Sequence, residues 1–95
     1  MKIVKFTPKA LAQIKRYFRD DSKLIGVRLN FEWMSFSLEL IDRIDPYDSI
    51  LQQDGVFIYL STTANLAIDK LVIDYEYLEE DPFTFRTLKD DEIAW

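Results

Sequence analysis

GVRLNFEWMSFSLEL, residues 26–40, says more about the fold than any other part of the sequence. Apolar and polar residues alternate on either side of Trp33, which is typical of strands with one buried face. One strand is predicted over residues 24–31 and another through residues 36–40, with a turn or bulge over residues 32–35. The side chains expected to face the core from these strands are Ile25, Val27, Leu29, Phe31, Phe36, Leu38 and Leu40. The indole of Trp33 and the thioether of Met34 therefore fall where the chain changes direction.

The sequence before this region predicts a short strand and an amphipathic helix. Residues 2–6 alternate charged and apolar side chains, which favours a first strand. Thr7 offers a hydroxyl to cap a helix, and Pro8 fits the first helical position without losing a hydrogen bond. The helix is expected to end at the polar run of residues 20–22, and its apolar face consists of Ala10, Leu11, Ile14, Tyr17 and Phe18.

The sequence after residue 40 predicts four more strands and a short helix. A polar loop over residues 42–49 leads to a hairpin of residues 50–53 and 56–60, because Asp54-Gly55 tolerates the positive φ that tight turns need. The second of these strands is apolar on both faces and is predicted to be central in its sheet. Hydroxyl side chains at residues 61–63 predict a short helix through Ile68. Strands are then expected over residues 71–78 and 83–86.

This order of elements predicts one α+β domain over residues 1–95, with mostly antiparallel or mixed β-sheets, one long N-terminal helix and one short helix. A chain of 95 residues is long enough for one modest core and too short for two. The predicted members of that core are Leu11, Ile14, Phe18, Val27, Leu29, Phe57, Ile58 and Ile73.

The composition excludes several classes of chemistry. The chain has no Cys and no His, which rules out disulfides, thiolate or imidazole metal ligands, and nucleophilic catalysis of the Cys-His or Ser-His-Asp kind. A net charge of −5 with scattered basic residues disfavours nucleic acid and anionic membranes as partners. The N-terminal residues lack the apolar core of a signal peptide, and no apolar run is long enough to span a bilayer. A cytoplasmic protein is expected.

Six short motifs follow one another along the chain: FTPKALAQIKRYF at residues 6–18, GVRL at 26–29, FSLEL at 36–40, DGVFIYL at 54–60, LVIDYEY at 71–77 and PFTF at 82–85. Their order and spacing resemble those of the HesB-like or IscA-like A-type iron–sulfur carriers. In the first motif, Thr7, Ala10 and Ile14 stand at the positions of the family's Thr-x-x-Ala-x-x-x-Ile segment. The resemblance implies a HesB-like fold for the whole chain.

The departures from that family concern its metal ligands. The carriers hold a cluster or iron with one cysteine in a Gly-Cys-Ser-Gly-Phe turn and with a Cys-Gly-Cys near the C-terminus. Counting back from Phe36, the first ligand position corresponds to Trp33, and the second site falls near Ala94 and Trp95. The resemblance therefore implies a divergent member that lacks the cysteine ligands. We expect no metal site, no cofactor and no catalytic residue.

Five residues are candidates for an interaction surface or a pocket: Phe31, Trp33, Met34, Phe83 and Trp95. In one interpretation Trp33 packs against the end of the sheet or against Trp95 and fills the space of a lost cluster. In the other, Trp33, Met34 and Trp95 form an exposed apolar patch for a protein partner or a second subunit, since aromatic residues and Met are enriched at interfaces. The expected function is a non-enzymatic interaction module related to iron–sulfur cluster assembly, which cannot ligate a cluster itself and which binds a protein partner or forms a homodimer. The alternative is a protein that binds a small molecule in the former cluster pocket.

Acidic clusters elsewhere are better explained as surface. Asp42, Asp45 and Asp48 are three residues apart, whereas a calcium-binding EF-hand loop places ligands at every second residue. Residues 79–81 form an acidic run that is typical of solvated surface. Asp74 and Glu76 share one strand face, but no sugar-binding cleft is indicated beside them.

Overall fold

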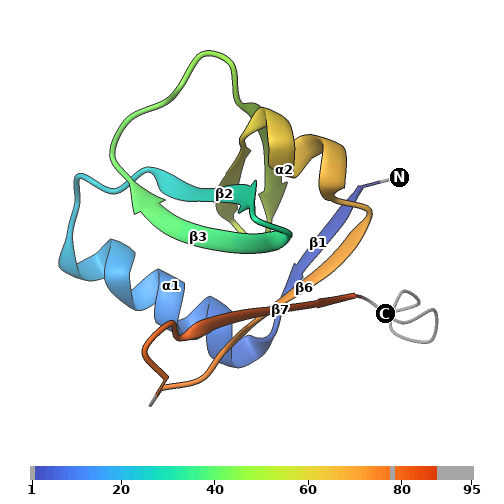
Figure 1. The fold of residues 1–95 in the computed structure, drawn as a ribbon. Helices are drawn as coiled ribbons and strands as arrows, with labels where there is room; N and C mark the ends of the chain where they lie inside the picture. Colours follow the sequence, from blue (N-terminus) through green and yellow to red (C-terminus); the bar gives the residue numbers. More distant parts are fainter. Residues whose placement is uncertain (1, 78, 88–95) are drawn as a thin grey trace.

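The computed structural model describes residues 2–77 and 79–87 of the chain. Seven strands and two helices follow one another in the predicted order (Figure 1). Leu78, the predicted end of one strand, and the second ligand region at residues 94 and 95 lie outside the described residues. The elements are β1 (Ile3–Phe6), α1 (Pro8–Asp20), β2 (Gly26–Glu32), β3 (Ser35–Ile41), β4 (Ser49–Gln53), β5 (Val56–Leu60), α2 (Thr62–Ala67), β6 (Lys70–Tyr75) and β7 (Phe83–Thr87).

The strands form two mixed sheets, which confirms the predicted α+β class. One sheet has the order β1-β6-β7, and the other has the order β3-β2-β5-β4. Pairs that are close in sequence, β2 with β3, β4 with β5 and β6 with β7, are antiparallel. Pairs that are distant in sequence, β1 with β6 and β2 with β5, are parallel. The predicted central position of β5 is confirmed, because β2 and β4 flank it.

Helix α1 begins where its capping residues predict. Thr7 has an extended backbone, and its hydroxyl accepts a hydrogen bond from the amide of Ala10 at 3.2 Å. The same hydroxyl donates to the carboxylate of Asp74 in β6 at 2.7 Å, which ties the start of the helix to the smaller sheet. Ala10 and Ile14 are fully buried on the face that packs against β6 and β1. Neither described helix has the length and apolar character needed to cross a bilayer.

One apolar core receives side chains from both sheets and both helices. Of the predicted core residues, five are buried, namely Ile14, Val27, Leu29, Ile58 and Ile73. Leu11 and Phe18 are partly buried and pack against this core. The smaller sheet and α1 thus lie on one side of the four-stranded sheet, as the ribbon shows (Figure 1).

The prediction that Phe57 belongs to the core is wrong. Successive side chains of a strand point to opposite faces, so Val56, Ile58 and Leu60 fill the core while Phe57 points to the outer face of the sheet. Phe57 is 45% exposed there, whereas Tyr59, two residues further along the same face, is buried. Ile25 is likewise 37% exposed, since it precedes the first residue of β2 and is not part of the strand.

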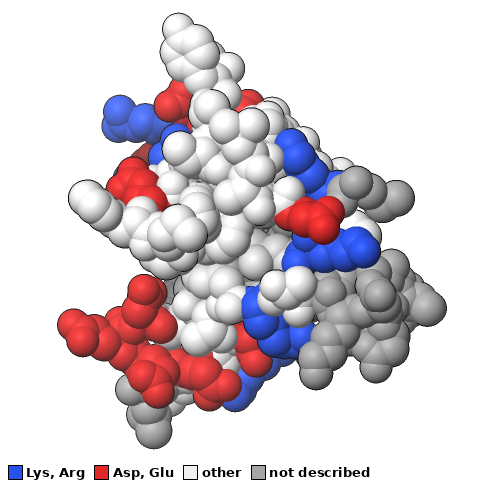
Figure 2. All heavy atoms as spheres, turned by 45° about the vertical axis from the view of Figure 1, so that its right-hand side comes forward, with Lys and Arg blue, Asp and Glu red and all other residues white. Residues whose placement is uncertain are grey.

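Tyr77 also departs from its predicted place. The strand predicted over residues 71–78 includes Tyr77, but β6 ends at Tyr75 and Tyr77 lies in the turn that follows. Its side chain is largely exposed, whereas Tyr75 is buried. Figure 2 shows acidic side chains gathered at the lower left of one face, whereas acidic and basic side chains are interspersed over the rest of that face.

Candidate functional site

The turn between β2 and β3 contains two residues, Trp33 and Met34, because Glu32 pairs with Ser35 across the hairpin. Their φ angles are 54° and 63°, so both residues adopt the left-handed conformation of a type I′ turn. That turn is usually made by Asn-Gly or Asp-Gly, since other side chains are strained at positive φ. The β4–β5 hairpin of the same chain uses Asp54 and Gly55, at 53° and 81°, for the same purpose. The β2–β3 turn therefore carries two residues that its backbone does not favour.

Both side chains of this turn are in solvent. Trp33 is 95% exposed and Met34 is 89% exposed. The interpretation that Trp33 packs against the end of the sheet is therefore wrong, and the exposure of both residues agrees with the interpretation of an apolar patch. A contact of either residue with Trp95 falls outside the described residues.

The base of the hairpin is held by aromatic packing. The rings of Phe31 and Phe36 face each other across β2 and β3 with centroids 4.7 Å apart, and Phe36 lies 5.9 Å from Phe85 of β7. Phe31, one of the predicted site residues, is thus half-buried between the turn and the core. Phe83 packs on Tyr75 at 5.2 Å instead, so it belongs to a different aromatic pair from Phe31.

Polar contacts also hold the last residues of β2. The side-chain oxygen of Asn30 accepts hydrogen bonds from the Ser61 hydroxyl at 2.8 Å and from the Thr63 hydroxyl at 3.3 Å. The Asn30 amide donates to the Glu32 carboxylate at 3.0 Å, one residue before the turn. Because Ser61 also caps α2, these bonds connect the hairpin to that helix. The apolar tip formed by Trp33 and Met34 is therefore carried on a rigid support.

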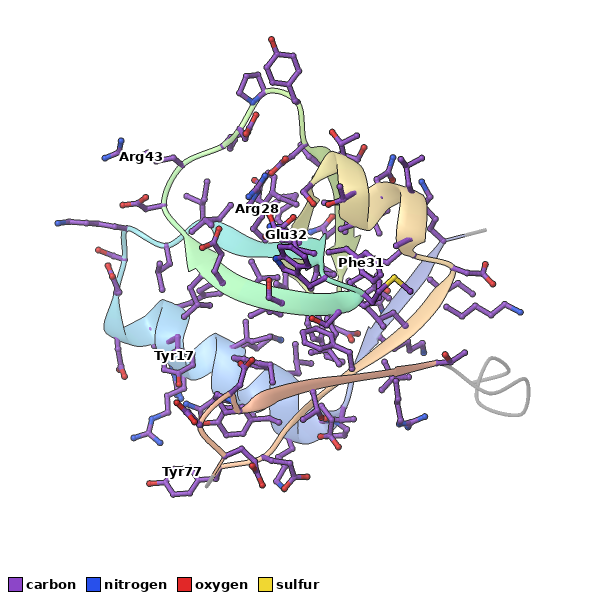
Figure 3. The ribbon with its side chains drawn as sticks, viewed as in Figure 1. Tyr17, Arg28, Phe31, Glu32, Arg43 and Tyr77 are labelled. Carbon is purple, nitrogen blue, oxygen red and sulfur yellow. The ribbon has the colours of Figure 1, made fainter. Side chains whose placement is uncertain are left out.

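A charged cluster on the outer face of the four-stranded sheet escaped the sequence analysis. Arg28 of β2 donates to both carboxylate oxygens of Asp48, at 2.7 and 3.1 Å, and lies 3.9 Å from both Asp45 and Glu39. Hydrogen bonding to Asp48 raises the pKa of Arg28 above its usual value. The Asp48 side chain is only 2% exposed, so the expectation that it is a surface group is wrong, and its pair with Arg28 fastens the loop of residues 42–48 to the sheet. Arg28 is labelled in Figure 3. The alternation in β2 placed Arg28 on the outer face, but no sequence signal linked it to Asp48.

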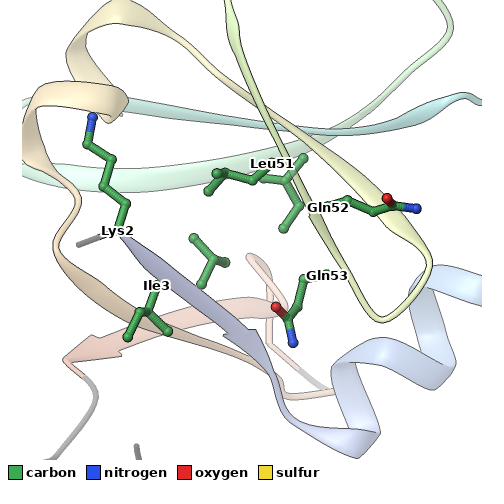
Figure 4. Close-up of a pocket in the computed structure, with 7 residues that line it drawn as sticks. Lys2, Ile3, Leu51, Gln52 and Gln53 are labelled. Carbon is green, nitrogen blue, oxygen red and sulfur yellow. The ribbon is translucent and has the colours of Figure 1, made fainter.

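A small cavity lies between β1 and the β4–β5 hairpin (Figure 4). Its volume is about 130 Å³, and it is lined by Lys2, Ile3, Val4, Leu51, Gln52, Gln53 and Ile58. Pockets for drug-sized ligands are usually about 300–1,000 Å³. The cavity is distant in sequence from the turn, and a side chain as exposed as Trp33 does not line an enclosed pocket. The alternative of a small-molecule site at the former cluster position stays a prediction, because the second ligand region at residues 94 and 95 lies outside the described residues.

The residues present do not fit an iron–sulfur cluster. Thiolates, with imidazoles in some sites, ligate such clusters, and this sequence contains neither Cys nor His. Within residues 2–77 and 79–87, Asp and Glu side chains also form no group of three that could hold a metal ion. This chain by itself therefore offers no ligand set for a cluster.

Comparison with known proteins identifies the family. The profile of the family described as iron-sulphur cluster biosynthesis matches residues 1–86. Iron-sulfur assembly protein 1 of Schizosaccharomyces pombe is 30% identical over 80 residues, which cover 77% of this chain but only 42% of that protein. This chain thus spans about two fifths of the length of that curated relative.

Solved structures share the fold. The crystal structure of Escherichia coli SufA, described as involved in biosynthesis of iron–sulfur clusters, superposes with a TM-score of 0.74 at 21% identity, over 90% of this chain and 80% of that one. A protein from Aquifex aeolicus gives 0.72 at 19% identity, over 93% and 94% of the two chains. IscA with a 2Fe–2S cluster gives 0.62 at 22% identity, over 93% and 83%. Since the family profile covers nearly the whole sequence, this chain belongs to the iron-sulphur cluster biosynthesis family, the HesB-like and IscA-like proteins, and is a member without cysteine.

Proposed function

We propose that this protein is a non-enzymatic interaction module of iron–sulfur assembly, and that the Trp33–Met34 turn is its point of contact with a partner. The observation that carries the proposal is an exposed indole and thioether at a turn whose backbone disfavours both. The resemblance places a ligand cysteine of the carriers at the position of Trp33. In this chain, the same position presents apolar surface in place of a thiolate.

Energetics support a role for these two residues in recognition. A non-Gly residue in the left-handed conformation is less stable by about 1–2 kcal/mol, and two such residues adjoin here. Among the described residues, neither side chain recovers that free energy by packing, because Trp33 and Met34 are 95% and 89% exposed. Trp is enriched among residues that dominate binding energy, and burying an indole removes about 150–250 Å² from water. A partner that covers the turn would recover what the isolated fold loses.

The partner we propose is a cysteine-bearing carrier of the same family. Such a carrier would supply the thiolates that this chain lacks, and this chain would supply a rigid apolar contact. The two side chains together cover much less than the roughly 800 Å² per partner of a standard interface. We therefore expect a weak and reversible complex unless neighbouring surface also takes part.

The test is titration calorimetry of this protein against a purified cysteine-bearing A-type carrier from the same organism. Wild type should bind, and the double variant Trp33→Asn, Met34→Gly should bind at least about tenfold more weakly, which corresponds to about 1.4 kcal/mol. The matched control is Leu66→Asn, which removes another exposed apolar side chain, on α2. Equal binding by wild type and the double variant, or equal losses in the double variant and the control, would contradict the proposal. Sedimentation of the protein alone shows whether a second copy takes the place of the carrier.

A further inference from the structure

A groove beside helix α1 has features of a binding site. It runs between α1 and the end of β6, has a volume of about 420 Å³, and is lined by Lys9, Ala12, Gln13, Arg16, Arg19, Tyr75 and Tyr77. The α1 residues that line it form one stripe along the helix, because they are spaced three or four positions from one another except for the adjacent residues 12 and 13. Tyr75 is buried at the floor and Tyr77 is exposed at the edge. Tyr17 and Tyr77 lie on the same side of the molecule (Figure 3).

The groove is basic in an acidic protein. Helix α1 contains four basic residues, Lys9, Lys15, Arg16 and Arg19, and one acidic residue, Asp20, whereas the whole chain has a net charge of −5. Three of the four cations line the groove. The fourth, Lys15, is exposed on the same helix but is not part of the lining. Three of the twelve Lys and Arg residues of this acidic chain thus line one groove.

The two guanidinium groups of the groove have no carboxylate partner among the described residues. Lys9 has one contact, 3.8 Å from Glu76, and both side chains are more than half exposed. Exposed pairs of this kind contribute little, about 0–1 kcal/mol. Arg28, by contrast, contacts three carboxylates. Arg16 and Arg19 are therefore available for an anion.

We propose that this groove binds an extended acidic peptide segment of a partner protein. From Lys9 to Arg19 the helix rises about 15 Å. One phosphate or carboxylate is too small to contact cations over this length, whereas about five residues of extended chain would span it. Guanidinium groups bind carboxylates through paired hydrogen bonds, and the tyrosine rings provide apolar surface for alternate side chains of the segment. The acidic run of residues 79–81 begins two residues after Tyr77, which disfavours a long polyanion such as nucleic acid.

The experiment measures fluorescence anisotropy of a fluorescein-labelled peptide of about seven alternating Glu and Val residues, with a Lys-Val peptide as the charge-reversed control. Wild type should bind the Glu-Val peptide and not the Lys-Val peptide, and binding should weaken as salt is raised. The double variant Arg16→Gln, Arg19→Gln should bind at least about tenfold more weakly. Lys15→Gln is the matched control, since it removes a charge from the same helix outside the groove, and it should bind within about twofold of wild type.

Several outcomes would overturn the proposal. Absence of binding by wild type, or a loss in Lys15→Gln as large as in the double variant, would show that the groove is not a specific site. Tighter binding of duplex DNA or of vesicles containing anionic lipid, with the same dependence on Arg16 and Arg19, would show that the occupant belongs to another class. Self-association of wild type that is lost in the double variant would assign the groove to a second copy of this chain. Thermal melts of both variants check that the fold is retained.

Discussion

The Trp33–Met34 turn predicts an unusual result, in which substitution raises stability and removes binding. Replacing the two residues together, Trp33→Asn and Met34→Gly, gives the turn the residues that a type I′ backbone favours. Asn tolerates the left-handed conformation better than Trp does, and Gly adopts it without strain. The φ angles of 54° and 63° need not change.

The magnitude follows from strain and exposure. Relief of left-handed strain is worth about 1–2 kcal/mol for each residue. The greater flexibility of Gly in the unfolded chain offsets about 0.4–1 kcal/mol of this. Little burial is lost, because Trp33 is 95% exposed and the hidden remainder, roughly 10 Å² of its surface, is worth about 0.3 kcal/mol. A net stabilisation of about 1–2 kcal/mol is expected, since Asn relieves only part of the strain at its position.

Urea denaturation followed by far-ultraviolet circular dichroism measures this change, as a higher midpoint with an unchanged m-value. In a thermal melt, each stabilisation of about 1 kcal/mol should raise Tm by about 4–8 °C. The reciprocal control is Asp54→Trp, Gly55→Met in the other hairpin, which should destabilise the protein by about 2–3 kcal/mol. Space is no obstacle at Gly55, since nothing lies within 4 Å of the position that a Cβ would occupy there. A loss of stability above about 1 kcal/mol in the Trp33 and Met34 variant would refute the reasoning, because it would mean that these side chains are packed.

Four further predictions concern the charges, the helix cap, the core and the cluster. Arg28→Met should lower the free energy of unfolding by about 3–5 kcal/mol in denaturant titration, because it leaves the buried Asp48 carboxylate without its cation. The added substitution Asp48→Asn should restore part of that stability. Thr7→Val should cost about 1–2 kcal/mol at neutral pH relative to Thr7→Ser, because it removes the helix cap and the bond to Asp74. The hydrogen bonds from the Thr7 hydroxyl and the Tyr75 amide lower the pKa of Asp74. The stabilisation that the Asp74 carboxylate contributes is therefore present above its unfolded pKa of about 3.9 and is lost as pH falls through its lower folded pKa. The difference in stability between Thr7→Val and Thr7→Ser should accordingly shrink in melts at acid pH. Ile58→Ala should lower the free energy of unfolding by about 2–5 kcal/mol, and Phe57→Ala should lower it clearly less, because Phe57 is half-exposed. The reverse order would mean that the faces of β5 are misassigned. Anaerobic reconstitution with iron and sulfide should leave the protein colourless, whereas charge-transfer absorption retained after desalting would contradict the lack of a ligand set.

The sequence predicted best those features that depend on neighbouring residues. Thr7 and Pro8 start a helix by local hydrogen bonding and backbone geometry, and Asp54-Gly55 makes a tight turn for the same kind of reason. Alternation over residues 26–40 assigned the inner and outer faces of β2 and β3 correctly. The resemblance to a known family added the overall architecture, which the comparisons confirmed.

Features that depend on distant residues were not predictable from these patterns. Alternation assigns Phe57 to a face of β5, but how far that face is covered depends on elements elsewhere in the chain: Tyr59 on the same face is buried, whereas Phe57 is 45% exposed. The parallel pairing of β1 with β6 brings together segments more than sixty residues apart, and no local rule specifies it. The pairing of Arg28 with Asp48 was not predictable either, because alternation assigned Arg28 to a strand and composition assigned Asp48 to a loop, and neither pattern linked the two residues.

The candidate site shows why a broken local rule is informative. Sequence analysis located the turn at residues 32–35, but it left Trp33 open as either a packed or an exposed residue. Only the pairing of Glu32 with Ser35 reduces the turn to two residues, and in this structure both of them have positive φ. In most natural sequences local preference and global fold agree, and conflicts gather at functional sites. Asp54-Gly55 shows that this chain satisfies the same backbone requirement with favourable residues elsewhere. Among the described residues, the conflict at Trp33 and Met34 is therefore confined to one turn, and the partner recognition that we propose would give it a physical reason.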